Sequence, residues 1–181
     1  MRRPTAAACR RPGPLTLLAL AASPTPGVVE FTRMWVSSDG ETHLQDCTMQ
    51  NMTKVLLPGG ENAQFVRDLD GVVEPTQLIF TQMAADSTNT WHQCPTAQFV
   101  VVLAGSWFVN TTDGASKVMG PGHVLYQDDY VGLTANGTSP VHFSAAAEAG
   151  TPCNQLIVSA ATRTAAIDDL SCDWAAQFAA A

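Results

Sequence analysis

The chain has 181 residues, of which 46% are hydrophobic and 14% are charged, a composition typical of a globular domain with a sizeable core. Its net charge of −7 repels a phosphate backbone, so the sequence predicts no nucleic-acid partner. No apolar run is long enough for a transmembrane helix, which predicts no membrane-spanning segment.

The N-terminal segment, residues 1–28, differs in charge from the rest of the chain. It carries four arginines and no acidic residue, followed by the apolar and small-residue run PLTLLALAASPTPG. A basic stretch followed by a short apolar stretch predicts a targeting peptide, either secretory or organellar, with a disordered leader as the alternative. Three Asn-x-Ser/Thr sequons, at Asn51, Asn110 and Asn136, favour the secretory pathway.

Short apolar segments separated by turn residues predict β-strands from Phe31 onward. The Asp113-Gly114 pair predicts a tight hairpin, and a break at Ala104-Gly105 divides the longest apolar run into two strands or bends one. The segment 59–71 is rich in turn residues and predicts a connection. The predicted strands lie within 31–36, 53–58, 76–83, 98–112, 116–126, 141–147 and 154–160. Many short strands predict a single all-β domain over 29–161, a sandwich or a barrel.

The C-terminal segment, residues 162–181, has a different periodicity. Ile167, Leu170, Trp174 and Phe178 recur at spacings of three, four and four, which predicts a short amphipathic helix that packs on the barrel or on a partner subunit. An Ala-rich frayed tail is the alternative.

Four cysteines lie outside the N-terminal segment, at positions 47, 94, 153 and 172. An even number permits two disulfides in an oxidising compartment. For Cys94 the sequence leaves three roles open: disulfide partner, buried thiol or metal ligand.

The stretch WHQCPTAQFVVVLAGSW, followed by DGASKVMGPGHVLYQDD, resembles the two motifs of the cupin superfamily. The resemblance is strongest from Trp91 to Asp129 and is to the small single-domain cupins, whose first motif places Trp-His before a proline and a glutamine. DGETHLQD, residues 39–46, is similar to the opening strand of that group. The resemblance implies a jelly-roll β-barrel around a central pocket. The periodicity of residues 162–181 adds a short C-terminal helix to this predicted fold.

The resemblance also implies a metal site, but most of its ligands are replaced. His92 matches the first histidine of the motif, Cys94 occupies the place of the second, and Gln98 occupies the place of the glutamate. The later histidine of the second motif would fall near 134–135, where there is none, although His142 could supply an imidazole from a later strand. A neutral amide is a weak ligand for a divalent ion, so the sequence predicts no tightly bound cofactor, with a divalent transition metal on His92, Cys94, Gln98 and His142 as the alternative.

Two aromatic side chains join His92 and Gln98 as predicted pocket residues: Trp91 and Tyr126. Asp128 and Asp129 follow Tyr126, and because adjacent residues on a strand point to opposite faces, at most one of them would face a pocket.

Three functions follow from these patterns. The first is a barrel that binds a small molecule in its central pocket, with His92 and Gln98 as polar groups and a degenerate metal site. The second is a metal-dependent enzyme, an oxygenase, isomerase or lyase, with His92, Cys94 and His142 as non-standard ligands. The third is a structural or interaction barrel that forms a homodimer. The sequence does not decide whether the chain is an enzyme, because a fold alone does not identify a reaction.

Overall fold

The computed structural model describes residues 25–49, 51–56, 63–69, 74–161 and 172, which form eleven strands and no helix. The strands are β1 (Glu30–Val36), β2 (Thr42–Thr48), β3 (Thr53–Leu56), β4 (Ala63–Val66), β5 (Pro75–Met83), β6 (Gln98–Ala104), β7 (Trp107–Thr111), β8 (Ser116–Met119), β9 (Val124–Gln127), β10 (His142–Ala146) and β11 (Cys153–Ala160).

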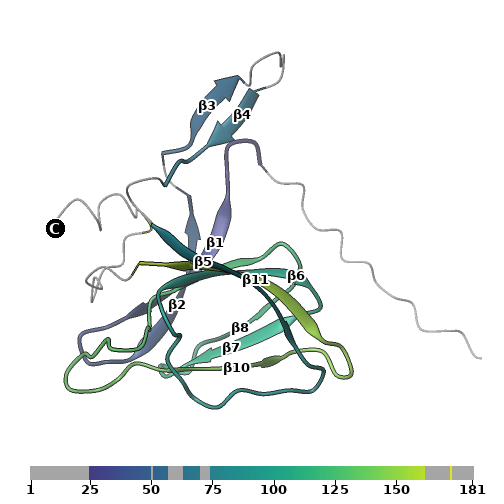
Figure 1. The fold of residues 1–181 in the computed structure, drawn as a ribbon. Helices are drawn as coiled ribbons and strands as arrows, with labels where there is room; N and C mark the ends of the chain where they lie inside the picture. The colour runs from purple at the N-terminus through teal and green to yellow at the C-terminus, as the bar shows by residue number, and fades with distance from the viewer. Residues whose placement is uncertain (1–24, 50, 57–62, 70–73, 162–171, 173–181) are drawn as a thin grey trace, which may run out of the picture.

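Two sheets form the body of the molecule (Figure 1). The larger has six strands in the order β2-β1-β9-β6-β11-β5, with a parallel pair between β1 and β9 and antiparallel pairs elsewhere. The smaller has three strands in the order β10-β7-β8. The β3–β4 hairpin projects away from both sheets (Figure 1).

The predicted jelly-roll barrel with a C-terminal helix is wrong as a description of this structure. The all-β class is correct, but no hydrogen-bonded ladder among the described residues joins the sheets into a closed barrel: β2 and β5 end one sheet, and β10 and β8 end the other. The predicted helix lies outside the described residues except for Cys172. The described residues contain no helix long and apolar enough to cross a membrane.

The long apolar run divides into two strands, β6 and β7, which belong to different sheets. Gly105 makes this change of direction with a φ of +73°, and a Cβ there would lie 2.2 Å from the carbonyl oxygen of Pro152. Only glycine fits such a close approach of two backbone segments in this conformation. The break predicted at Ala104-Gly105 is therefore the point where the chain crosses from one sheet to the other.

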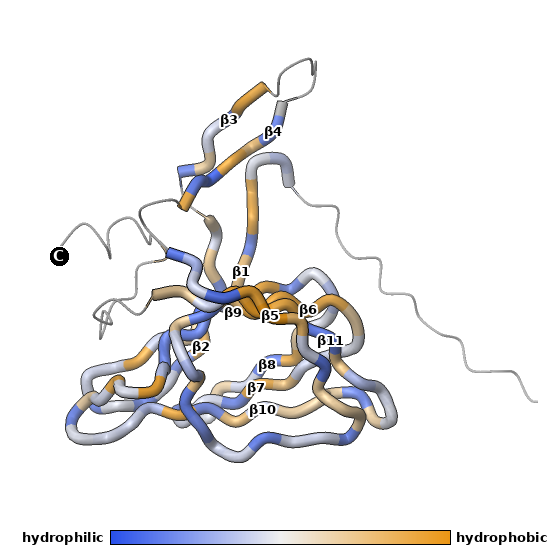
Figure 2. Tube along the Cα trace, in the orientation of Figure 1, coloured by the Kyte–Doolittle hydropathy of each residue, from blue (hydrophilic) through white to orange (hydrophobic). Residues whose placement is uncertain are grey.

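The core lies between the two sheets. Strand alternation directs Val100 and Val102 of β6 and Leu125 of β9 toward Trp107 and Val109 of β7, and all five side chains are at least 96% buried. Figure 2 shows hydrophobic segments gathered where β5, β6 and β11 cross the body, with others on β1 and on the β3–β4 hairpin.

A second cluster lies on the opposite face of the six-stranded sheet. Phe31, Cys47, Ala97 and Tyr126 are buried there, and Cys172 packs against them. A disulfide joins Cys47 to Cys172 across 125 residues of sequence, and it ties the C-terminal part of the chain to this face.

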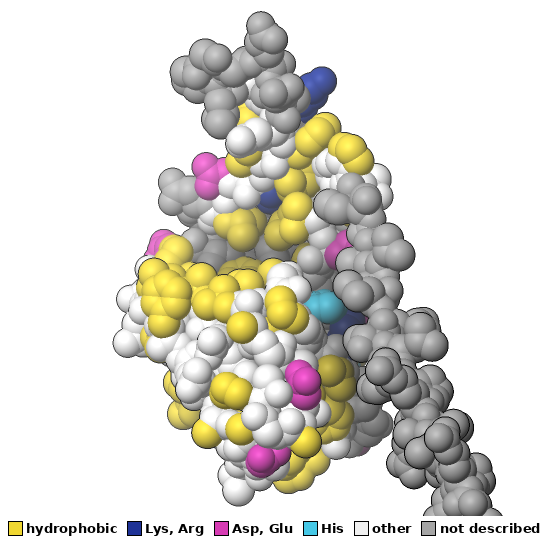
Figure 3. All heavy atoms as spheres, turned by 90° about the vertical axis from the view of Figure 1, so that its right-hand side faces the viewer, with side chains coloured by type: hydrophobic (Ala, Val, Ile, Leu, Met, Phe, Trp, Pro, Cys, Tyr) yellow, Lys and Arg dark blue, Asp and Glu magenta, His cyan; other side chains and the backbone are white. Residues whose placement is uncertain are grey.

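The outer face of the same sheet also carries exposed hydrophobic side chains. Leu78 and Phe80 of the edge strand β5 are 63% and 72% exposed, beside Val158 and Leu156 of β11 in the strand register. Figure 3 shows hydrophobic side chains gathered on the upper part of the body, with a hollow between them and the hairpin. Exposed apolar patches of this kind are typical of interaction surfaces.

Candidate functional site

A cavity of about 590 Å³ lies between the inner faces of the two sheets, beside the apolar core. The inner face of the larger sheet contributes alternate residues of β5 and β11, and the smaller sheet contributes Trp107, His142 and Ser144. The segment 84–96 closes one side, because its backbone pairs with β10 through bridges at Thr88 and His92. The volume lies within the range of pockets that hold small organic ligands.

The structure brings four of the residues predicted from sequence to this cavity: His92, Cys94, Gln98 and His142 all line it. His92 and His142 form a two-residue antiparallel bridge, in which each backbone N–H donates to the other's carbonyl oxygen at 2.9 Å. Their ring centroids are 4.3 Å apart. This pairing joins residues fifty positions apart, which the cupin-like motif did not place together.

A chain of side-chain hydrogen bonds runs from Gln98 to a buried carboxylate. Gln98 Nε2 donates to Gln127 Oε1 at 2.7 Å, and Gln127 Nε2 lies 3.1 Å from His142 Nε2. His142 Nδ1 in turn lies 2.6 Å from Asp129 Oδ2. With the amide as placed, an imidazole that has its proton on Nδ1 accepts from Gln127 and donates to Asp129. Gln98 and His142 are thereby held in fixed orientations at the cavity wall.

The side chains of Asp128 and Asp129 lie on opposite sides of the sheet, as the alternation of adjacent strand residues predicts. Asp129 is fully buried behind His142 on the cavity side, whereas Asp128 lies on the opposite side with Arg33 and Tyr126. Arg33 Nη2 is 3.2 Å from Asp128 Oδ2, and the Arg33 side chain is completely buried. Burial raises the pKa of Asp128, against the lowering effect of the Arg33 guanidinium.

Cys94 is a buried free thiol. Burial, followed by the negative charge of Asp129, raises its pKa far above the ordinary value. A thiol is a nucleophile and a metal ligand as the thiolate, so this environment opposes both roles. Cys153 is also a buried free thiol, so the two described cysteines left outside the Cys47–Cys172 bond do not form the second disulfide that the sequence permits.

The other two predicted pocket residues lie elsewhere. Trp91 is 47% exposed and its ring lies 6.0 Å from that of Phe143 on the outside of the smaller sheet. Tyr126 is buried in the cluster on the opposite face of the six-stranded sheet, where its ring lies 4.8 Å from that of Phe99. Neither lines the cavity.

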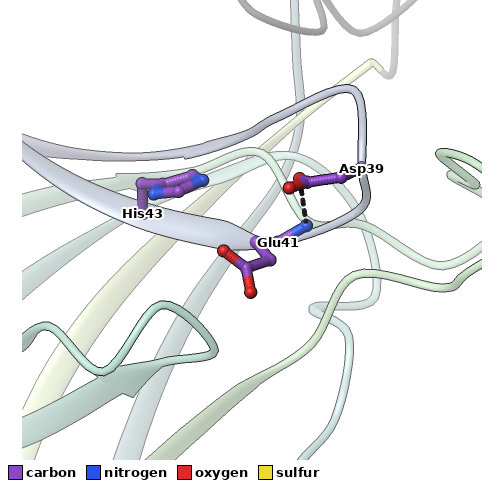
Figure 4. Close-up of side chains that lie close together, drawn as sticks. All are labelled: Asp39, Glu41 and His43. Carbon is purple, nitrogen blue, oxygen red and sulfur yellow. Dashed lines mark hydrogen bonds between the residues drawn. The ribbon is translucent and has the colours of Figure 1, made fainter.

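The predicted metal ligands do not form a compact donor set. Among the described residues, His92, Cys94 and His142 do not bring their donor atoms within 4.8 Å of one another, whereas Asp39, Glu41 and His43 do. Figure 4 shows these three residues around the β1–β2 turn, with the Asp39 carboxylate accepting a hydrogen bond from the Glu41 backbone N–H.

The Asp39–Glu41–His43 group is a candidate cation site with a poor fit to a tightly held metal. Both ring nitrogens of His43 are engaged: Nδ1 lies 2.8 Å from Asp113 Oδ2, and Nε2 lies 2.8 Å from Ser37 Oγ. An incoming ion would have to displace the Ser37 hydroxyl from Nε2. Asp39 and Glu41 are exposed, so water competes for both carboxylates.

Sequence reasoning did not identify most of the polar side chains that line the cavity. They come from β5, β11 and the segment before β6, and they are Gln77, Thr81, Ser87, Asn89, Thr96, Gln155 and Ser159. Polar residues at alternate positions of two apolar strands, Gln77 and Thr81 on β5 and Gln155 and Ser159 on β11, were the signal that could have indicated a polar inner face.

Comparisons with known proteins give no family. No protein-family model and no curated protein matches the chain. Among solved structures, the chain is similar to protein NMB1881 from Neisseria meningitidis, with 14% identity and a TM-score of 0.33 over 49% of this chain and 82% of that one.

Proposed function

We propose that this protein binds a small molecule in the cavity between its two sheets. The observation that carries the proposal is a cavity of about 590 Å³ with buried polar side chains in its wall that hydrogen bonds hold in place. A binding pocket needs preorganised polar groups, and the Gln98–Gln127–His142–Asp129 chain supplies them.

Blocking the cavity tests this proposal. Thr81 lines the cavity from the edge strand β5 and is half-buried, so Thr81→Trp fills the space with little disturbance of the core. A thermal-shift screen with neutral sugars, sugar acids and aromatic acids should give a compound that raises the Tm of the wild type. At a concentration 100 times its Kd, the stabilisation should be about 2.7 kcal/mol.

Val118→Trp is the matched control, because Val118 is 57% exposed and lies outside the cavity. We expect the compound to raise the Tm of Val118→Trp as it raises that of the wild type, and to leave the Tm of Thr81→Trp unchanged. Equal stabilisation of both variants would place the binding site elsewhere and would refute the proposal.

A second candidate function is self-association through the outer face of β5. Leu78 and Phe80 expose apolar surface there, and β5 is an edge strand of its sheet, so a second copy could pair with it about a two-fold axis. We expect light scattering to give twice the chain mass for the wild type and the single chain mass for Phe80→Glu. A wild type of single chain mass would rule out the dimer.

We also propose that the protein is secreted and that it is related to the cupin superfamily. The disulfide between Cys47 and Cys172 supports an oxidising compartment, which agrees with a secretory leader in residues 1–28. The motif between Trp91 and Asp129 supports the kinship, since its first histidine and its glutamine position both line the cavity.

A further inference from the structure

The cavity wall carries no permanent charge. None of the side chains that line it, within the described part of the chain, is an aspartate, glutamate, lysine or arginine. The nearest carboxylate in the hydrogen-bond chain, Asp129, is fully buried behind His142 and is already bonded to it. A charged ligand would lose its hydration there without gaining an opposite charge, so the wall favours an uncharged ligand.

Three buried donors among the residues that line the cavity have no hydrogen-bond partner: the Thr96 hydroxyl, Gln155 Nε2 and Trp107 Nε1. The two residues with N–H donors, Gln155 and Trp107, are only 5% and 4% exposed. Buried polar groups in folded proteins are nearly always paired, and an unpaired one costs about 1–3 kcal/mol. Both residues line the same cavity, from different sheets. Neither N–H is exposed as placed, so each side chain would have to turn toward the cavity for an oxygen atom of a bound molecule to satisfy it.

The rest of the wall combines two kinds of surface. The amide of Gln77 and the hydroxyls of Thr81 and Ser159 can each donate and accept, as a ligand hydroxyl can. Ile79 and Ile157 add apolar surface between these polar positions on the same two strands. A molecule with hydroxyls around its rim and C–H groups on its faces matches this alternation.

We propose that the ligand is an uncharged polyhydroxylated compound of the carbohydrate class, whose oxygen atoms accept hydrogen bonds from Gln155 Nε2 and Trp107 Nε1. This inference rests on the proposed function, because it names the ligand class of the same cavity. The donors indicate where oxygen atoms of the ligand would bind, and the wall, which has no charged side chain, disfavours sugar acids and amino sugars.

Calorimetric titration with five probes tests the ligand class. The neutral probes are glucose, N-acetylglucosamine and maltose, and the charged probes are glucuronate and glucosamine. We expect a neutral probe to bind most tightly. Gln155→Leu removes the amide with little change in shape, and Trp107→Phe removes the indole N–H together with one ring of a buried side chain. Each should weaken that probe about 3- to 10-fold.

Gln64→Leu is the matched control, since Gln64 is exposed on the β3–β4 hairpin and should leave the affinity unchanged. Gln155→Leu has a second readout that separates a binding role from damage to the fold. Because it removes an unpaired buried donor, it should keep or raise the Tm of the ligand-free protein while it weakens binding.

The outcomes separate this inference from the proposed function. Binding of glucuronate or glucosamine as tight as that of the neutral sugars, or no binding of any neutral sugar, would overturn the ligand class. Unchanged affinity in both Gln155→Leu and Trp107→Phe would overturn it as well. If Thr81→Trp still abolishes the binding of some other compound, the cavity remains the site and only the class is wrong; if it does not, the proposed function fails.

Discussion

Replacing Arg33 with methionine is expected to lower the free energy of unfolding by about 3–5 kcal/mol, because the change leaves a buried carboxylate without its ionic partner. Arg33 is completely buried and its Nη2 lies 3.2 Å from Asp128 Oδ2. The Tyr126 hydroxyl, at 3.5 Å from Asp128 Oδ1, is too distant and too weak a donor to replace a guanidinium. Urea denaturation followed by tryptophan fluorescence measures the loss.

Two further variants show whether the loss of unfolding free energy in Arg33→Met comes from the unpaired buried charge. Lys117→Met removes an ion pair with Asp46, whose side chain is 76% exposed, and should cost no more than about 1 kcal/mol. Arg33→Met combined with Asp128→Asn should recover part of the stability, because the amide does not carry the charge. A loss in Arg33→Met equal to that in Lys117→Met would contradict this explanation.

Loss of the Cys47–Cys172 disulfide should lower the free energy of unfolding by roughly 4–5 kcal/mol, since the bond closes a loop across 125 residues. The bond also holds Cys172 against the buried cluster of Phe31, Ala97 and Tyr126, so this cluster should become more exposed after reduction. Denaturation of the wild type with and without dithiothreitol measures the effect directly.

The double variant Cys47→Ala with Cys172→Ala is the control. It should be as unstable as the reduced wild type, and dithiothreitol should not change it further. Cys94 and Cys153 remain in this variant, so the comparison isolates the one disulfide from the two free thiols. A wild type whose denaturation midpoint does not move on reduction would contradict the assigned role.

Local patterns in the sequence predicted most strands but not how they assemble. The alternation in residues 31–36 and 98–112 and the Asp113-Gly114 turn correspond to β1, β6, β7 and the β7–β8 hairpin. The strand β4 was missed because Ala63–Val66 lies within a segment dominated by Gly, Asn and Asp. Whether edge strands meet is a non-local property, which explains why the barrel was predicted and open sheets were found.

The candidate site was predictable only in part for the same reason. The motif identified His92 and Gln98 because their spacing is local, but His142 reaches His92 through a bridge between distant segments. Tyr126 was placed in the pocket although strand parity puts it on the face opposite to Gln127, the residue that bonds Gln98. The disulfide could not be assigned from four cysteines without the fold that brings Cys47 and Cys172 within 5.5 Å between Cα atoms.

A crystal structure of the protein grown with its tightest-binding neutral sugar shows whether the cavity binds an uncharged molecule. We expect electron density for the sugar between the two sheets, with oxygen atoms about 3 Å from Gln155 Nε2 and Trp107 Nε1. Density for the sugar only on the outer surface, with no sugar in the cavity, would contradict it.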